Sequence, residues 1–107
     1  MLTRETLVGP WAGLPVAWTD RDEFDEQTYR ADVARCCDAG VPGVYTSGTT
    51  GEFYAMEFDE FKAVTRAAIE EARAHGVATM IGCTSTYTLG AVRRAAVAAE
   101  LGAEWRR

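Results

Sequence analysis

The feature that most constrains the fold of this chain is a strand-and-helix pattern that occurs three times in succession. Each unit has a short apolar run, then a longer segment whose apolar residues recur at helical spacing, then a glycine. The expected strands are residues 14–18, 43–46 and 78–82. Strands that alternate with helices form a parallel sheet with right-handed connections. The pattern therefore predicts an α/β fold, and it leaves a closed barrel and an open doubly wound sheet as alternatives.

The helices are predicted from their caps and their apolar faces. The first helix begins near Asp25, which can cap it, and ends at Gly40, which suits the left-handed conformation of a helix terminus. The second helix runs from about residue 57 to residue 74, and the third ends at Gly102. We expect the core-facing positions to be Tyr29, Val33, Cys36 and Cys37; Phe58, Phe61, Thr65, Ile69 and Ala72; and Leu89, Val92, Ala96 and Ala99.

Length and charge limit the function classes that are open to the chain. With 107 residues it forms a single unit, residues 1–107, which is less than half of the roughly 250 residues of a closed (β/α)8 barrel. The net charge of -5 argues against nucleic acid or a membrane surface as a partner. No apolar leader or membrane-spanning segment is visible, so we expect a cytoplasmic protein.

The cysteines and the single histidine do not predict a metal site. The three cysteines lack the spacing of a metal-binding pair, and we expect buried thiols at Cys36, Cys37 and Cys83. His75 precedes Gly76 at a predicted helix end, where a cation is stabilised by the helix dipole. We therefore expect no metal and no other cofactor.

The segment Gly48-Thr49-Thr50-Gly51-Glu52 directly follows the second apolar run. Two short hydroxyl side chains between glycines expose backbone N–H groups and hydroxyl donors, which suit a carboxylate or a phosphate. Ligands of α/β folds bind at the C-terminal ends of strands, where this segment falls. A plain strand-to-helix turn would use the same glycines. The position after the second strand adds some weight to the binding role, and the resemblance described next adds most of it, with Glu52 expected to hold the loop.

The sequence Tyr-Thr-Ser-Gly-Thr-Thr-Gly-Glu at residues 45–52 resembles the signature of the dihydrodipicolinate synthase and N-acetylneuraminate lyase family. The resemblance extends from about Pro10 to about Ala103. Members of that family are pyruvate-dependent lyases and aldolases built on a (β/α)8 barrel. The resemblance thus implies a partial barrel of about three βα units, with helices on one face of a parallel sheet. The first run departs from the family, because Val16-Ala17-Trp18-Thr19 stands where Thr-Pro-Phe is usual.

The resemblance also implies a class I aldolase mechanism, in which a lysine forms a Schiff base with pyruvate or another 2-oxo acid. Thr50 would bind the substrate carboxylate through its N–H and hydroxyl groups. Gly48 and Thr49 would line the same site, and Thr49 would also pass a proton between tyrosines as part of a relay. For the full-length protein we expect a homo-oligomer.

The remaining candidates have simpler roles. The one lysine, Lys62, lies on a predicted helix, where its charge would reach water. The family's catalytic lysine and tyrosine come from later strands, so we expect this chain to lack them. Hydroxyl residues 84–86 are expected to cap the next helix rather than to contact substrate. The aromatic residues near strand ends are expected to serve packing rather than a pocket wall, namely Trp11, Trp18 and Tyr54.

Two function classes follow. The first is the N-terminal part of a Schiff-base-forming lyase or aldolase whose lysine lies elsewhere. The second is a non-catalytic truncated half-barrel that binds a small anion at Thr49 and Thr50, or that only assembles with a partner. The ending Trp105-Arg106-Arg107 replaces the family's next hydrophobic run, as a frameshift or a truncation would. An exposed inner face and two open sheet edges predict marginal stability or association.

Overall fold

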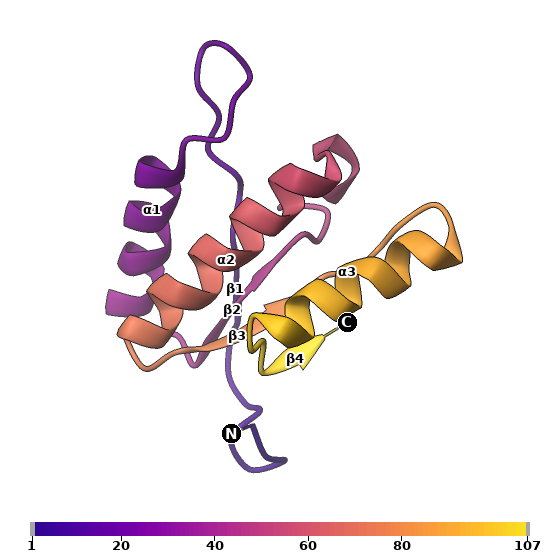
Figure 1. The fold of residues 1–107 in the computed structure, drawn as a ribbon. Coiled ribbons are helices and arrows are strands. Elements are labelled where there is room, and N and C mark those ends of the chain that lie inside the picture. Colours follow the sequence, from indigo (N-terminus) through magenta and orange to yellow (C-terminus); the bar gives the residue numbers. More distant parts are fainter. Residues whose placement is uncertain (1, 107) are drawn as a thin grey trace.

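Strands and helices alternate along the chain (Figure 1). The computed structural model describes residues 2–106. Within that range the strands are β1 (Ala12–Gly13), β2 (Gly43–Thr46), β3 (Ala78–Ile81) and β4 (Trp105–Arg106). The α-helices are α1 (Glu26–Asp38), α2 (Phe58–Ala74) and α3 (Thr88–Glu100), and the short 3-10 helix η1 (Phe53–Ala55) precedes α2. None of the helices described is long and apolar enough to cross a membrane.

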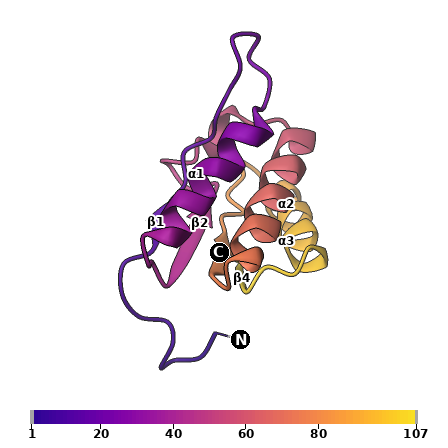
Figure 2. The same cartoon turned by 90° about the vertical axis from the view of Figure 1, so that its left-hand side faces the viewer.

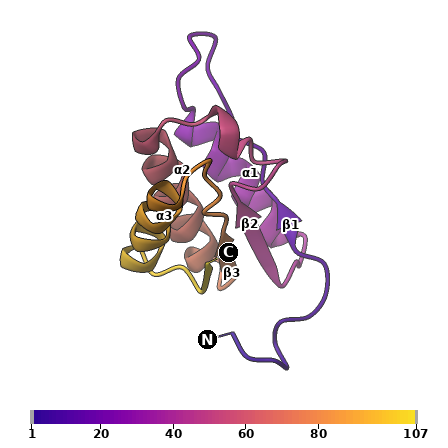
Figure 3. The same ribbon diagram turned by 90° about the vertical axis from the view of Figure 1, so that its right-hand side faces the viewer.

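The strands form one parallel sheet in the order β1-β2-β3-β4. In its register Tyr45 pairs with Met80, and Met80 pairs with Trp105. Figures 2 and 3 show from opposite sides that the three α-helices lie on one face of the sheet. A doubly wound sheet would carry helices on both faces, whereas helices on one face and sequential strand order are those of a (β/α)8 barrel. The structure confirms the expected partial barrel.

The helix-covered face of the sheet holds the core. Successive strand residues point to opposite faces, and along β2 and β3 the most buried positions are Val44, Thr46, Thr79 and Ile81. Val44 belongs to a cluster formed with residues of α1 and α2, including Tyr29, Val33, Val64 and Ala68. Ile81 belongs to a second cluster, with Phe61, Ile69 and Ala98. The helix-free face receives the side chains of Tyr45 and Met80, which are only half-buried.

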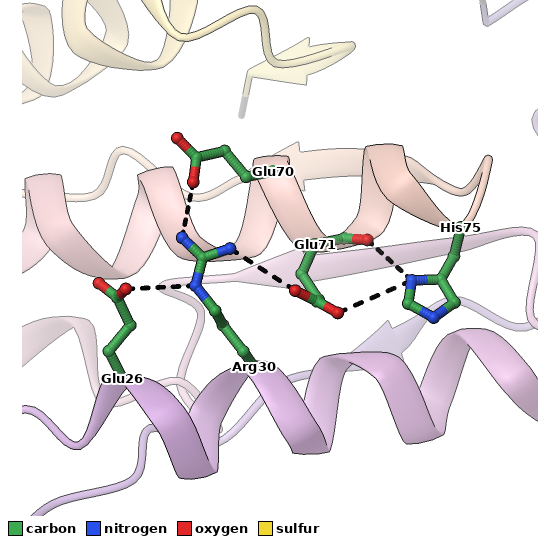
Figure 4. A network of polar contacts seen from close by, with 5 residues as sticks. All are labelled: Glu26, Arg30, Glu70, Glu71 and His75. Carbon is green, nitrogen blue, oxygen red and sulfur yellow. Dashed lines mark hydrogen bonds and ion pairs between the residues drawn. The ribbon is translucent and has the colours of Figure 1, made fainter.

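An ion-pair network joins α1 to α2 (Figure 4). Arg30 on α1 donates to the carboxylate of Glu70 on α2 at 2.6 Å and to Glu26 on its own helix at 3.2 Å. A third carboxylate, that of Glu71, lies 3.5 Å from the same guanidinium group. The hydrogen bond to Glu70 is the main reason that the pKa of Arg30 is raised. His75 closes the row, with its Nδ1 2.9 Å from the carbonyl oxygen of Glu71.

The helix ends confirm the capping predictions for α1 and α2. Asp25 is the N-cap of α1 and accepts a hydrogen bond from the N–H of Thr28 at 3.1 Å. Gly40 follows that helix with a φ of +89°, the left-handed conformation expected of it. His75 is the C-cap of α2, and Gly76 follows it at φ +69°. Local sequence therefore determines where these two helices end.

The first strand was predicted in the wrong place. Residues 14–18 were expected to form it, but β1 is Ala12–Gly13, and pairing with β2 ends where the Leu14 N–H donates to the Tyr45 carbonyl. Pro15 has no N–H with which to continue the pairing. Leu14 and Val16 are apolar because both are buried in the core cluster of α1 and α2, not because they lie in the sheet. Trp18 instead forms an isolated antiparallel bridge with Phe24.

The predicted inner face of α3 was also wrong. Leu89 and Val92 are 54% and 57% exposed, and Ala96 and Ala99 are exposed as well. The positions of α3 that are buried are Gly90 and Ala98. These small residues allow the helix to approach its neighbours closely. Helical spacing identified an apolar stripe but could not tell which side of the helix meets the rest of the fold.

Candidate functional site

The turn after β2 begins with an unusual backbone conformation at Ser47. This residue is 1% exposed and has a φ of +57°, a left-handed value that is uncommon outside glycine. Its hydroxyl lies 3.3 Å from that of Thr46. The Glu52 N–H then donates to the Thr49 carbonyl at 3.1 Å, and Glu52 itself has a φ of +55°. Two left-handed residues thus fold the segment 47–52 back against the end of β2.

Three neighbouring loops meet at the Ser47 backbone. The N–H of Gly82, at the end of β3, donates to the Thr46 carbonyl at 2.9 Å. A Cβ on Gly82 would overlap the Ser47 carbonyl oxygen. A Cβ on Gly51 would stand 2.6 Å from the Ser47 nitrogen and 3.2 Å from the Leu14 carbonyl oxygen. Glycine is required at both positions because the backbones of the first three strand ends approach one another so closely.

A pocket opens at the C-terminal ends of β2 and β3. Its wall combines hydroxyl side chains and glycines with a few apolar side chains, and it comprises Tyr45, Thr46, Ser47, Gly48, Thr49, Phe53, Met80, Gly82 and Thr84. None of these residues is charged. Hydroxyl groups can donate to an anionic oxygen or accept from a hydroxyl group of a ligand. The pocket can therefore hold a small polar or anionic group. Its lining residues include no carboxylate, histidine or lysine that could act as a general base.

The structure brings together some of the residues predicted for this site. Gly48 and Thr49 line the pocket, whereas Thr50 is not among the lining residues, and both threonines are exposed. Thr84, which was expected to cap a helix, lines the pocket as well. Glu52 contributes to the turn through its backbone, and its side chain makes no capping hydrogen bond. The site is thus centred on the first half of the predicted segment.

The capping role expected of residues 84–86 is wrong. The N-cap of α3 is Tyr87, and its side chain makes no capping hydrogen bond. Ser85 and Thr86 instead line a second hollow beside the first, together with Tyr54 and Arg94. The guanidinium carbon of Arg94 lies 5.6 Å from the ring centroids of both Phe58 and Phe61. Hydroxyl side chains at this strand end are therefore available to the two hollows.

The other sequence candidates lie away from the pocket wall. Lys62 is on α2 with its Nζ 4.9 Å from the ring centroid of Phe58, as expected for a helix lysine. Trp11 packs against Gly43, and Trp18 packs against the core, as predicted. Tyr54 is 68% exposed, so it does not serve the packing role expected of it. Among the described residues, no group of three or more histidine, cysteine or carboxylate side chains could hold a metal ion.

Sequence reasoning missed most of the pocket wall, namely Tyr45, Thr46, Ser47, Phe53, Met80 and Gly82. The Tyr45 ring crosses the helix-free face, where a Cβ on Gly13 would stand 2.7 Å from it and a Cβ on Gly48 would stand 3.0 Å from it. Strand alternation was a usable signal for Tyr45, since its neighbour Val44 is an obvious core residue. Nothing in the sequence marks Ser47, because serine is not a residue that predicts a left-handed backbone.

Comparison with known proteins identifies a family, which the geometry of the pocket alone does not. The sequence model of the Dihydrodipicolinate synthetase family matches residues 9–105. A protein named "Probable 5-dehydro-4-deoxyglucarate dehydratase", from Methylobacterium radiotolerans, is 38% identical over 81 residues, which are 76% of this chain and 26% of that protein.

Solved structures agree with the sequence match. Dihydrodipicolinate synthase from Aquifex aeolicus superposes with a TM-score of 0.85 at 26% identity, over 92% of this chain and 33% of that one. The Escherichia coli K12 prophage protein YagE, solved in complex with pyruvate, gives a TM-score of 0.78 at 26% identity, over 90% and 33% of the two chains. The present chain spans about a quarter to a third of the length of these relatives.

Proposed function

The chain belongs to the dihydrodipicolinate synthetase family, and from that membership we propose that it is the N-terminal part of a Schiff-base-forming lyase or aldolase. Its substrate is pyruvate or another 2-oxo acid. This chain supplies the part of the site that holds the substrate carboxylate. The Schiff-base lysine comes from a part of the family fold that lies outside this sequence.

One observation carries this proposal: Gly48 and Thr49 line a pocket at the C-terminal ends of β2 and β3. A (β/α)8 barrel places its chemistry at that end of its strands. The wall of hydroxyls and glycines offers donors to a carboxylate without adding a competing negative charge. The solved relative that holds pyruvate is consistent with a 2-oxo acid ligand.

Thr49 and Thr50 take different roles in the proposal. Thr49, on the pocket wall, passes a proton between tyrosines as part of a relay. Thr50, which is exposed in the chain alone, reaches the carboxylate through its N–H and hydroxyl once a ligand fills the site. The dehydratase relative extends the choice of substrate, because 5-dehydro-4-deoxyglucarate carries a ketone next to a carboxylate and is itself a 2-oxo acid.

Lys62 explains why the chain is not proposed as a complete enzyme. It is the one lysine of the sequence, and its ammonium group stands over the Phe58 ring on α2 rather than in the pocket wall. A Schiff base requires an amine that reaches the substrate ketone. This placement favours, as the alternative function, a non-catalytic half-barrel that binds a small anion or only assembles with a partner.

Pyruvate titration of the isotope-labelled chain, followed by NMR, tests the binding role. We expect amide shifts at Gly48, Thr49 and Thr50 that saturate with pyruvate and not with the neutral analogue pyruvamide. Thr50→Val should weaken the binding, whereas Thr88→Val at the start of α3 should not. Equal shifts with pyruvate and inorganic phosphate would favour the small-anion alternative. No shift with any anion would contradict both.

Borohydride reduction in the presence of pyruvate tests the catalytic half separately. We expect no covalent adduct on this chain, because Lys62 is not among the residues that line the pocket. A longer protein that contains the remaining strands should be trapped on a lysine outside this sequence. An adduct at Lys62 would overturn the division of the site that is proposed here.

A further inference from the structure

We propose that Tyr45 determines how large an anionic head group the pocket accepts, and that Gly13 is a positioning residue that keeps the Tyr45 ring out of the pocket. The proposal rests on the carboxylate-binding role proposed above for Gly48 and Thr49. It adds a selectivity to that role, because the pocket then takes a planar carboxylate and rejects a bulkier tetrahedral head group.

The Tyr45 ring lies against two glycines of neighbouring segments. A Cβ on Gly13, the last residue of β1, would stand 2.7 Å from both the Cζ atom and the hydroxyl oxygen of this ring. A Cβ on Gly48, in the turn after β2, would stand 3.0 Å from its Cε2 atom. Carbon atoms pack at about 3.5–4.0 Å, so the ring fills the space that a side chain at position 13 would need. The ring lies across β1 because Gly13 has no side chain.

The same ring is part of the pocket wall. Tyr45 pairs in register with Met80 on β3, and both residues line the pocket. The Cε2 edge of the ring lies against Gly48, so an anionic group that reaches Gly48 and Thr49 lies beside the ring. The pocket has a volume of about 150 Å³, well below the roughly 300 Å³ at which pockets for drug-sized ligands begin. In so small a space the position of one ring decides which head groups fit.

The strand order determines where the ring would move if position 13 carried a side chain. Strand β2 lies between β1 and β3, so Tyr45 has Gly13 on one side and Met80 on the other. A methyl group at position 13 would push the ring away from β1, and therefore toward Met80 and into the pocket. Gly13 is not among the residues that line the pocket. A substitution there therefore affects the ligand through Tyr45.

A second contact between a glycine and an aromatic ring provides a matched control. A Cβ on Gly43 would overlap the six-membered ring of Trp11. Gly43 begins β2 and Trp11 directly precedes β1, so this contact lies at the N-terminal ends of the strands. Neither residue lines the pocket, which lies at the opposite ends. An added methyl group displaces an aromatic ring in both places, but only the ring beside Gly13 belongs to the pocket.

Two ligands of equal charge separate the size of the head group from its electrostatics. Pyruvate carries a planar carboxylate, whereas methyl acetylphosphonate carries a bulkier tetrahedral head group with the same single negative charge. We expect the unmodified chain to bind pyruvate more tightly by about tenfold or more in an NMR titration. Tyr45→Val removes the ring and keeps a side chain that favours strands. It should reduce the preference for pyruvate to less than about threefold.

Gly13→Ala tests the positioning role. It should weaken pyruvate binding by about tenfold, because the displaced ring narrows the pocket. Adding Tyr45→Val to Gly13→Ala should remove that loss, since valine is too short to reach across β1. Gly43→Ala should leave the pyruvate dissociation constant unchanged. Circular dichroism of each variant checks that it retains its helices, and the rescue by Tyr45→Val is a result that a general loss of structure would not produce.

Fluorine NMR of the otherwise unmodified chain, labelled with 3-fluorotyrosine, keeps the test independent of how the variants fold. The chain has four tyrosines. We expect pyruvate to shift the resonance of Tyr45 and not that of Tyr29, which is buried in the core cluster of α1 and α2.

The outcomes distinguish this proposal from the proposed function. Amide shifts at Gly48 and Thr49 without a fluorine shift at Tyr45 would overturn the role of Tyr45 alone. So would equal affinities of the unmodified chain for the two ligands, a loss in Gly13→Ala that Tyr45→Val does not restore, or an equal loss in Gly43→Ala. No response from either the amides or the ring would contradict the proposed function together with this proposal.

Discussion

The backbone of Ser47 occupies the space that a side chain on Gly82 would need. The Gly82 N–H donates to the Thr46 carbonyl at 2.9 Å, and a Cβ on Gly82 would overlap the carbonyl oxygen of Ser47. The end of β3 is thereby held against the turn that follows β2. The pocket depends on this contact, since Ser47 and Gly82 are both part of its wall.

Substitution of Gly82 should cost more than substitution of Gly48. Gly82→Ala forces two backbone segments apart, and we expect it to lower the free energy of unfolding by about 2 kcal/mol. Gly48→Ala meets only the edge of the Tyr45 ring, at 3.0 Å, and a side chain can yield. Urea denaturation at one fixed chain concentration measures both, because self-association would otherwise shift the apparent stability. Equal losses would show that the loops do not meet as described.

Removal of the Tyr29 hydroxyl should stabilise the chain. Tyr29 is fully buried, and its oxygen has no hydrogen-bond partner among the described residues. We expect Tyr29→Phe to raise the free energy of unfolding by about 1 kcal/mol, because a buried polar group without a partner is costly. Tyr54→Phe, at a side chain that is 68% exposed, is the neutral control. A clear loss of stability in Tyr29→Phe would reveal a partner such as a buried water molecule.

The same tyrosine predicts a pH dependence. Burial raises the pKa of Tyr29 far above its ordinary value of 10.0. Below pH 10 the phenol is neutral in both the folded and the unfolded chain. Above it, the unfolded chain ionises and the folded chain does not, so this group's contribution to stability falls as the pH rises. The stability difference between Tyr29→Phe and the unmodified chain should therefore widen between about pH 9 and pH 11.

The ion pair between Arg30 and Glu70 should contribute modestly to the contact between α1 and α2. The two side chains are 26% and 51% exposed, so water screens their attraction. A double-mutant cycle with Arg30→Met and Glu70→Gln should give a coupling energy of about 0.5–1 kcal/mol. Added salt should reduce it. Salt at about 1 M screens the attraction between exposed charges, so a coupling energy that stays constant up to that concentration would contradict a mainly electrostatic link.

Helix capping offers a direct comparison between a confirmed and a rejected prediction. Asp25 accepts hydrogen bonds from both the N–H and the hydroxyl of Thr28. Asp25→Ala should therefore lower stability by about 1 kcal/mol. Thr86→Ala should change stability by less than about 0.5 kcal/mol, because α3 is not capped by a hydroxyl side chain. Thermal melts of the two variants would distinguish them, and a large loss in Thr86→Ala would restore the capping role.

The elements that were predictable are those fixed by their own residues. The ends of α1 follow from Asp25 and Gly40, and the strands at 43–46 and 78–81 follow from apolar runs that glycines or turns interrupt. The first strand was not predictable in this way, since Leu14 and Val16 are as apolar as strand residues but serve core packing. The face of α3 depended on which neighbours the helix meets, and helical spacing carries no such information.

The candidate site likewise contains residues that local sequence predicts and residues that only the sheet brings together. Gly48 and Thr49 were predictable because a local motif marks them, and both lie in the pocket wall. Ser47, Gly82 and Thr84 share that wall because the ends of two strands come together. Such a meeting is a property of the sheet and not of either segment alone. The carboxylate and proton-relay roles of Thr50 and Thr49 stay predictions.

The order of the strands also bears on how the fold is acquired during synthesis. Each strand pairs with the one just before it in the chain, so no strand has to wait for a distant partner. The buried members of the first core cluster all lie between Leu14 and Ala72, and they are complete before α3 leaves the ribosome. Each pairing still encloses a helix, as between Gly43 and Ala78, so it forms more slowly than contacts within a helix. We expect the fold to grow one strand and one helix at a time, from the N-terminus, while the unfinished edge of the sheet always lies at its most recently made strand.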